Sequence, residues 1–103
     1  NLIQIPIKKS TTLQDTLKEL GKHELNSILV EGGSKIFTSF IQEDLVDELI
    51  LYISPKILGK ESIDSISIES PIILRGAKKF KIYDSMLVGD DIKIIMRKKN
   101  KYK

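Results

Sequence analysis

The alternation of hydrophobic and polar positions predicts a strand at the N-terminus and a helix after it. Residues 2–7, LIQIPI, alternate apolar and polar side chains as a half-exposed strand does. Pro6 favours an edge strand or a strand end. The following stretch, STTLQDTLKELGKHEL, places three leucines on one helical face: Leu13, Leu17 and Leu20. Thr11 or Thr12 can cap this helix, and Gly21 can end it.

The next segment predicts a strand, a helix and a second strand. Residues 27–31, SILVE, form a short apolar run before two glycines, which is typical of a buried parallel strand. Residues 34–45 then place four apolar side chains at helical spacing: Ile36, Phe37, Phe40 and Ile41. Residues 46–55, VDELILYISP, start polar and become apolar, so they predict a strand that Pro55 ends.

The C-terminal part of the chain predicts a long connection and a β-hairpin. Residues 56–76 contain turn residues and scattered isoleucines, which indicates a connection with short extended pieces. Residues 80–88 and 92–96 flank a turn at Gly89–Asp91, the arrangement of a hairpin. The order of elements predicts a single α/β domain with an antiparallel end over residues 1–103.

Composition narrows the classes of function. The 103 residues contain no Cys and a single His, so disulfides and thiolate or histidine metal sites are not expected. No apolar run approaches the ~18–20 residues of a membrane span, and no signal-peptide pattern is present. We therefore expect a cytoplasmic protein with no membrane partner and no metal.

The net charge of +3 comes from 17 Lys and Arg residues against 14 Asp and Glu residues. The densest basic run, RKKNKYK, is typical of a solvated C-terminal tail. Nucleic-acid binding favours more arginine and exposed aromatic side chains among the charges, and only 6% of this chain is aromatic. We expect no nucleic-acid partner.

The segment from Glu31 to Ser39 contains the candidate chemistry. Gly32 and Gly33 separate the predicted strand from the predicted helix, and glycines there let a ligand approach the backbone closely. The helix N-terminus has unpaired N–H groups and partial positive charge, which suits a phosphate or pyrophosphate. Hydroxyls of three residues can add donors and Lys35 adds charge; the hydroxyls are those of Ser34, Thr38 and Ser39.

Two readings of this segment stay open. Glu31 would repel a phosphate, so it is better suited to the polar groups of a second ligand. The spacing matches neither a P-loop nor a Rossmann fingerprint, and a plain tight turn through the two glycines explains the pattern equally well.

Asp47 and Glu48 are adjacent on a predicted strand and so point to opposite faces, which argues against a paired-acid site.

Several motifs in order resemble one known family. VEGG, LVDEL, SPKILG and the hairpin VGDDIKI are similar to the riboflavin-biosynthesis reductase domain, the C-terminal part of the bifunctional pyrimidine deaminase/reductase. The resemblance implies a dihydrofolate-reductase-like fold: a mixed sheet flanked by helices and ending in a β-hairpin. It also implies that residues 1–103 match the C-terminal half of a larger reductase domain, and that a cis peptide joins Gly32 and Gly33.

The resemblance also implies a function. The family reduces 5-amino-6-(5-phosphoribosylamino)uracil to its ribitylamino product with NADPH, and its members self-associate, so we expect a homodimer or larger oligomer. By this resemblance, Glu31 corresponds to the residue that contacts the substrate in the family. The cofactor contacts fall on Gly33, Ser34, Lys35, Ile36, Phe37, Thr38 and Ser39. No catalytic residue is assigned, and we expect this half-domain to be incomplete for catalysis alone. The alternative is a non-catalytic nucleotide-binding or dimerisation module of the same fold.

Overall fold

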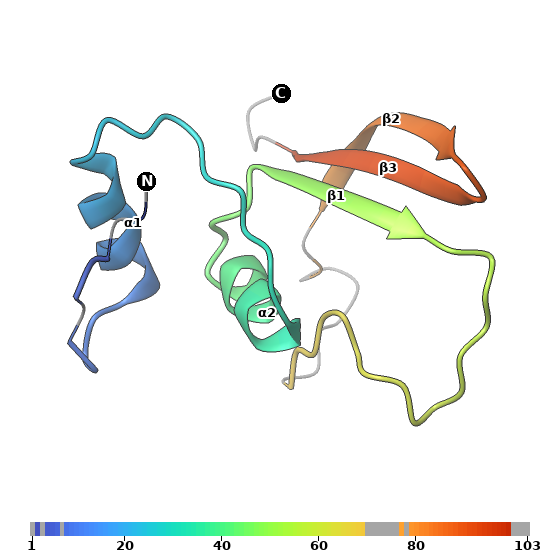
Figure 1. The fold of residues 1–103 in the computed structure, drawn as a ribbon, viewed down its shortest axis with the longest axis horizontal. Helices are drawn as coiled ribbons and strands as arrows, with labels where there is room; N and C mark the ends of the chain where they lie inside the picture. Colours follow the sequence, from blue (N-terminus) through green and yellow to red (C-terminus); the bar gives the residue numbers. More distant parts are fainter. Residues whose placement is uncertain (1, 3, 7, 70–76, 78, 100–103) are drawn as a thin grey trace. The chain divides into compact units, whose positions relative to one another are not determined.

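The computed structural model describes residues 2, 4–6, 8–69, 77 and 79–99. The chain divides into two compact units, residues 1–31 and residues 32–103. The first unit contains helix α1, and the second contains helix α2 and three strands (Figure 1).

The first unit is built around α1 (Leu13–Gly21), which confirms the predicted helix. Thr12 is its N-cap, and the Thr12 Oγ1 accepts a hydrogen bond from the Asp15 amide at 3.1 Å. Such a cap satisfies a backbone donor that the first turn leaves unpaired. Lys22 forms an ion pair with Glu19 at 2.7 Å, and the cap at Lys22 places Gly21 as the last helical residue.

Two predicted strands of this unit are wrong in the part of the chain that the structure describes. Leu2 and residues 4–6 lie in no strand, while Ile3 and Ile7 fall outside the described residues. Residues 27–31 are also non-strand, and the Leu29 side chain is 77% exposed. A strand needs a neighbour to complete its hydrogen bonds, and neither described segment pairs with one.

The second unit opens with α2 (Ser34–Gln42), which confirms the second predicted helix. Phe40 and Ile41 are buried, and Thr38 is the buried polar residue beside them. The chain then turns back, because the Leu45 amide donates to the Phe40 carbonyl at 2.9 Å and Asp44 has a φ of 60°. This reversal directs the chain into the sheet.

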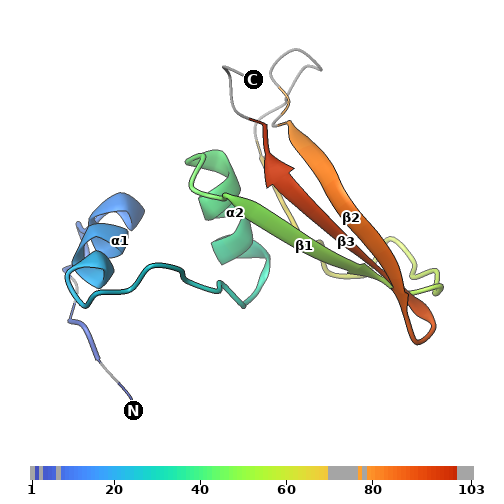
Figure 2. The ribbon, with the colours of Figure 1, turned by 90° about the horizontal axis from the view of Figure 1, so that it is seen from above.

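The sheet contains β1 (Glu48–Ile53), β2 (Phe80–Val88) and β3 (Asp91–Lys98) in the order β1-β3-β2, all antiparallel. Figure 2 shows β3 between its two neighbours. Val88 pairs with Asp91 across a two-residue turn, where Gly89 has a φ of 60°. A glycine with positive φ at that first position is typical of a type II′ turn. The predicted hairpin is therefore confirmed.

The two faces of the sheet differ. One face contains the half-buried side chains of Leu49, Leu51, Ile94 and Met96. Lys98 lies on the same face, and its Nζ reaches Asp44, just after α2, at 3.1 Å from the carbonyl and 2.9 Å from the carboxylate. In both ribbon views α2 lies beside the start of β1 (Figures 1 and 2). The contacts of Lys98 thus place the end of α2 on the side of this face.

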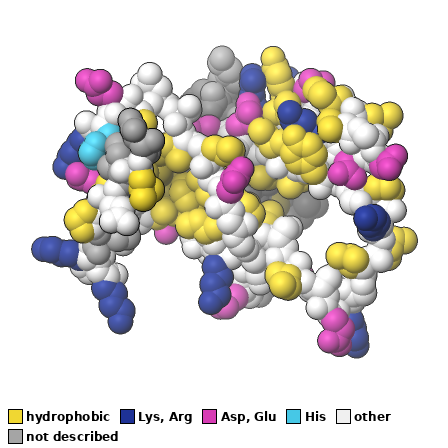
Figure 3. All heavy atoms as spheres, viewed as in Figure 1, with side chains coloured by type: hydrophobic (Ala, Val, Ile, Leu, Met, Phe, Trp, Pro, Cys, Tyr) yellow, Lys and Arg dark blue, Asp and Glu magenta, His cyan; other side chains and the backbone are white. Residues whose placement is uncertain are grey.

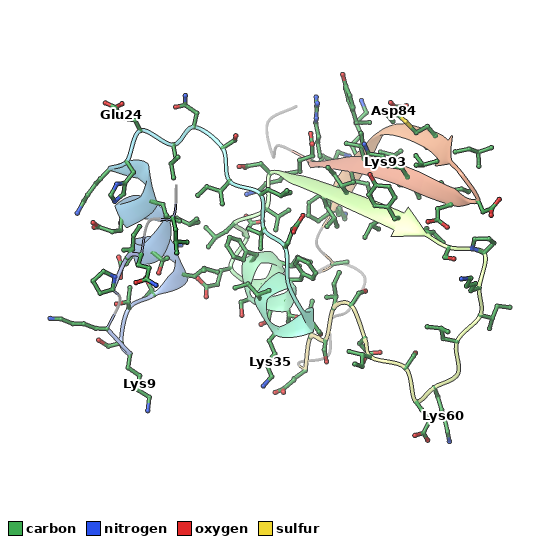
Figure 4. The ribbon with its side chains drawn as sticks, viewed as in Figure 1. Lys9, Glu24, Lys35, Lys60, Asp84 and Lys93 are labelled. Atoms are coloured by element: carbon green, nitrogen blue, oxygen red, sulfur yellow. The ribbon has the colours of Figure 1, made fainter. Side chains whose placement is uncertain are left out.

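The opposite face, here called the open face, also contains exposed apolar side chains. Hydrophobic side chains gather over the sheet in Figure 3. The exposed apolar residues of this face include Ile50 (40%), Tyr52 (58%), Tyr83 (62%), Met86 (43%) and Val88 (44%). Lys93, labelled in Figure 4, lies with its Nζ 5.9 Å from the centre of the Tyr52 ring.

Glu48 belongs to an ion pair rather than to a pair of acids. Its Oε2 accepts from Arg97 Nε at 2.9 Å, and the Arg97 guanidinium stacks 3.6 Å from the centre of the Tyr83 ring. The hydrogen bond to Glu48 raises the pKa of Arg97 above its usual value. Asp47 contributes its carbonyl to the Lys98 amide at 2.9 Å.

The connection after β1 has no regular structure from residue 54 to residue 69, as predicted, and residues 70–76 lie outside the description. Its Ile57 and Ile63 side chains are almost fully exposed. None of the helices that the structure describes is long and apolar enough to span a membrane. The described residues likewise contain no cluster of three or more His, Cys, Asp or Glu side chains suited to a metal ion.

Candidate functional site

The two glycines before α2 have different surroundings. Gly32 has a φ of 157°, and a Cβ built there would lie 2.7 Å from the Ile36 Cγ2. Gly33 is the N-cap of α2 with a φ of −88° and a ψ of 179°, and a Cβ there would meet nothing within 4 Å. A side chain at Gly32 would therefore meet Ile36 of α2, whereas Gly33 has free space beside its α-carbon.

The peptide bond between these glycines is trans, so the expected cis bond is wrong. The reversal into the helix is made instead by the backbone angles of Gly32, in a region that residues with a side chain rarely adopt. Glycine is therefore favoured at position 32 for two reasons: its φ, and the position of Ile36, which a Cβ would meet.

The first turn of α2 is arranged to attract an anion. Gly33 offers no side chain to cap the helix, and the first turn contains no acidic residue. The first-turn N–H groups have no partner within a helix, and the helix dipole adds partial positive charge there. Lys35 extends outward at this end of the helix (Figure 4). The structure therefore brings Gly33, Ser34 and Lys35 together at the helix start.

The two later hydroxyls are already hydrogen-bonded inside the protein. Thr38 is 7% exposed, and its Oγ1 accepts from the Ser67 amide at 2.8 Å. The Ser39 hydroxyl donates to the Lys35 carbonyl, one turn earlier in the helix, at 2.9 Å. Thr38 and Ser39 therefore lie beyond the first turn of α2 with their hydroxyls bonded to the protein, whereas Ser34 lies in the first turn.

The remaining candidates are apolar or lie before the helix. Ile36 covers Gly32 and is 37% exposed, while Phe37 is half-buried. The Phe37 amide donates to the Gly33 carbonyl at 3.3 Å and so starts the helical ladder. Glu31 is exposed and is the last residue of the first unit. Its assignment to substrate, like the cofactor assignments, stays a prediction.

Comparison with known proteins identifies the family. The model of the RibD C-terminal domain matches residues 3–94. The chain belongs to the RibD C-terminal domain family. Its fold resembles form 2 of RibD from Acinetobacter baumannii with a TM-score of 0.78 at 26% identity, covering 95% of this chain and 27% of that one. The predicted family and the α/β fold class are thereby confirmed.

Curated relatives of this RibD C-terminal domain are named for riboflavin biosynthesis. The riboflavin biosynthesis protein RibD of Buchnera aphidicola subsp. Baizongia pistaciae is 36% identical over 89% of this chain and 25% of its own length. A 5-amino-6-(5-phosphoribosylamino)uracil reductase of Buchnera aphidicola subsp. Acyrthosiphon pisum is 32% identical over 95% of this chain and 47% of its own length. The chain thus spans between a quarter and a half of these relatives.

Two features of the site were not predicted from the sequence. The contact between Gly32 and Ile36 is signalled by their four-residue spacing, which places them near each other where a helix begins. The Thr38–Ser67 hydrogen bond joins residues 29 apart through an irregular connection, and no local pattern signals it.

Proposed function

We propose that this chain contributes the cofactor-binding part of an NADPH-dependent reductase of riboflavin biosynthesis. The reaction is the reduction of 5-amino-6-(5-phosphoribosylamino)uracil to its ribitylamino product, in the cytoplasm. The match to the RibD C-terminal domain family over residues 3–94 is the observation that supports the proposal most strongly. The relative named for this reductase activity, aligned over 95% of the chain, supports the choice of reaction.

The start of α2 fits the diphosphate of a dinucleotide. A ligand that meets the helix N-terminus needs exposed amides and no side chain in its path, and the free space at Gly33 meets the second need. Ser34 can donate its hydroxyl to a phosphate oxygen, and the Lys35 ammonium adds charge that is screened in part by solvent. Bound NADPH supplies the hydride, while these residues bind and orient its phosphates.

Glu31 is assigned to the substrate. A carboxylate next to a phosphate site is repelled by the phosphate, whereas it accepts hydrogen bonds well from N–H and O–H groups of a uracil or a sugar. Glu31 is exposed and therefore accessible to such a ligand. The division proposed here gives Glu31 to the substrate and Gly33, Ser34 and Lys35 to the cofactor.

Two substitutions in the full natural protein test this division. Gly33→Val places a branched side chain in the space beside the helix start, so the Kd for NADPH should rise at least about tenfold. Glu31→Gln removes one charge-assisted acceptor, worth about 1.5–3 kcal/mol, so KM for the uracil substrate should rise or kcat should fall by about tenfold or more. Fluorescence titration with NADPH and steady-state kinetics measure the two effects.

The controls separate this outcome from general damage. Gly59→Val makes the same change at a glycine where a Cβ also meets nothing within 4 Å, and should leave NADPH binding unchanged. The same defect in the same ligand for Glu31→Gln and Gly33→Val would refute the division of roles. NADPH binding without any turnover of the substrate by the natural protein would instead favour the non-catalytic module. Titration with NADH beside NADPH tests the cofactor preference.

A homodimer is the proposed assembly. The open face combines Tyr52, Tyr83, Met86 and Arg97, residue types that are enriched in protein interfaces. Arg97 already has Glu48 as a partner and Lys93 lies over Tyr52, so two of the cations on this face are paired or stacked before any contact forms. That arrangement lowers the desolvation cost of covering the face.

A further inference from the structure

Thr38 is the buried polar side chain of α2, and its hydrogen bond fixes a distant segment. Its Oγ1 accepts the Ser67 amide at 2.8 Å, and Thr38 itself is 7% exposed. The Thr38 hydroxyl is therefore buried and bonded to Ser67, whereas a group that binds a ligand at the helix start would be exposed there. The contact instead joins the helix to the connection between β1 and β2.

This contact is where the described part of the connection meets the helix. From residue 54 to residue 69, Ile68 is half-buried and Ile66 is 36% exposed, whereas Ile57 and Ile63 are 101% and 93% exposed. Ile66 and Ile68, which flank Ser67, are less exposed than the other isoleucines that the structure describes in this connection. The segment Ile66–Ile68, here called the clip, is thus joined to Thr38 by the hydrogen bond of the Ser67 amide.

The clip lies close to the start of α2. Thr38 follows Ser34 by four residues, which is about one helical turn or roughly 5–6 Å along the axis. A segment bonded to Thr38 therefore lies within about one turn of the Ser34 amide. Figure 1 shows the last described part of the connection passing beside the N-terminal half of α2. The clip is thus a neighbour of the helix start in the part of the chain that the structure describes.

We propose that Thr38 is a positioning residue: it holds the clip beside the first turn of α2 and so shapes one wall of the dinucleotide site, without touching the cofactor through its hydroxyl. The inference rests on the proposed function, and it changes the role of one residue within it. In this proposal Thr38 affects cofactor binding by positioning Ser67, whereas Gly33, Ser34 and Lys35 contact the cofactor.

The test replaces the hydroxyl and keeps the shape. In the full natural protein, Thr38→Val is nearly isosteric but leaves the Ser67 amide without its acceptor, whereas Thr38→Ser retains the oxygen. We expect Thr38→Val to speed hydrogen exchange at the Ser67 amide and to raise the Kd for NADPH by about three- to tenfold, the loss typical of one neutral hydrogen bond. Thr38→Ser should restore both.

A matched control and two decisive outcomes complete the experiment. Thr16→Val removes a hydroxyl that donates to the Thr12 carbonyl within α1, and it should leave both readouts unchanged. Faster exchange at Ser67 in Thr38→Val with unaltered NADPH affinity would overturn the positioning role. Slow exchange at Ser67 in Thr38→Val would overturn the hydrogen bond itself. Failure of the unsubstituted protein to bind NADPH would refute the proposed function, and this role with it, in a different measurement.

Discussion

Replacing Gly32 by alanine should destabilise the protein far more than the same change at Gly33. The new Cβ would lie 2.7 Å from the Ile36 Cγ2, closer than carbon atoms approach without a shift. The φ of 157° adds strain, because residues with a side chain rarely adopt it. Backbone strain of this kind costs about 1–3 kcal/mol, and overpacking costs about 1–3 kcal/mol.

These two costs combine to a net loss for Gly32→Ala of about 1–5.5 kcal/mol, after an offset of about 0.4–1 kcal/mol from the stiffer unfolded chain. Gly33→Ala meets no atom within 4 Å and has an ordinary φ of −88°, so its free energy of unfolding should change by less than about 0.5 kcal/mol. Urea unfolding of the natural protein, followed by circular dichroism, measures both values.

A double-mutant cycle separates the two causes. Ile36→Ala removes the Cγ2 that the new Cβ would meet, so in that background Gly32→Ala should lose the overpacking cost and retain the backbone strain. The coupling free energy between the two positions should then be about 1–3 kcal/mol. Equal losses for Gly32→Ala and Gly33→Ala would refute the reasoning. A coupling of zero would show that the contact with Ile36 has no energetic consequence.

Two further predictions concern charge and assembly. The hydrogen bond from Lys22 lowers the pKa of Glu19, so this pair supports α1 above the ordinary pKa of a glutamate and loses its contribution as the pH falls through the lowered pKa. Glu19→Gln should remove that part of the acid dependence of the helix signal, which circular dichroism between about pH 2 and pH 6 measures. Light scattering at tens of micromolar should show a dimer that Ile50→Glu on the open face dissociates; a monomeric unsubstituted protein would contradict the proposed assembly.

The helices and the hairpin were predictable because their signals are local. Thr12 caps α1 through the amide three residues later, and Gly89 turns the chain between two strands that are neighbours in the sequence. In both cases the residues that decide the structure lie within a few positions of one another. The antiparallel pairing of β2 with β3 follows directly from such a short turn.

The strands predicted at residues 2–7 and 27–31 show where local signals end. An alternation of apolar and polar residues indicates which side chains can lie on one face. A strand forms only when its backbone can hydrogen-bond to a neighbouring strand. The described sheet gives that partner to β1, whose residues pair with residues of β3 that lie 39 to 49 positions later, and not to the segment before Gly32. The bond between Thr38 and Ser67 is of the same kind, since one of its partners is an irregular segment.

The turn that precedes α2 could be predicted from the sequence, but the different surroundings of its two glycines could not. Two consecutive glycines and a following helix indicated a turn that can admit a ligand. In the structure a side chain at Gly32 would meet Ile36 and would need a rare φ, whereas a Cβ at Gly33 would meet nothing within 4 Å. Free space beside the Gly33 α-carbon allows a ligand to approach the backbone there closely. That asymmetry is why a ligand is expected on the Gly33 side of the helix start.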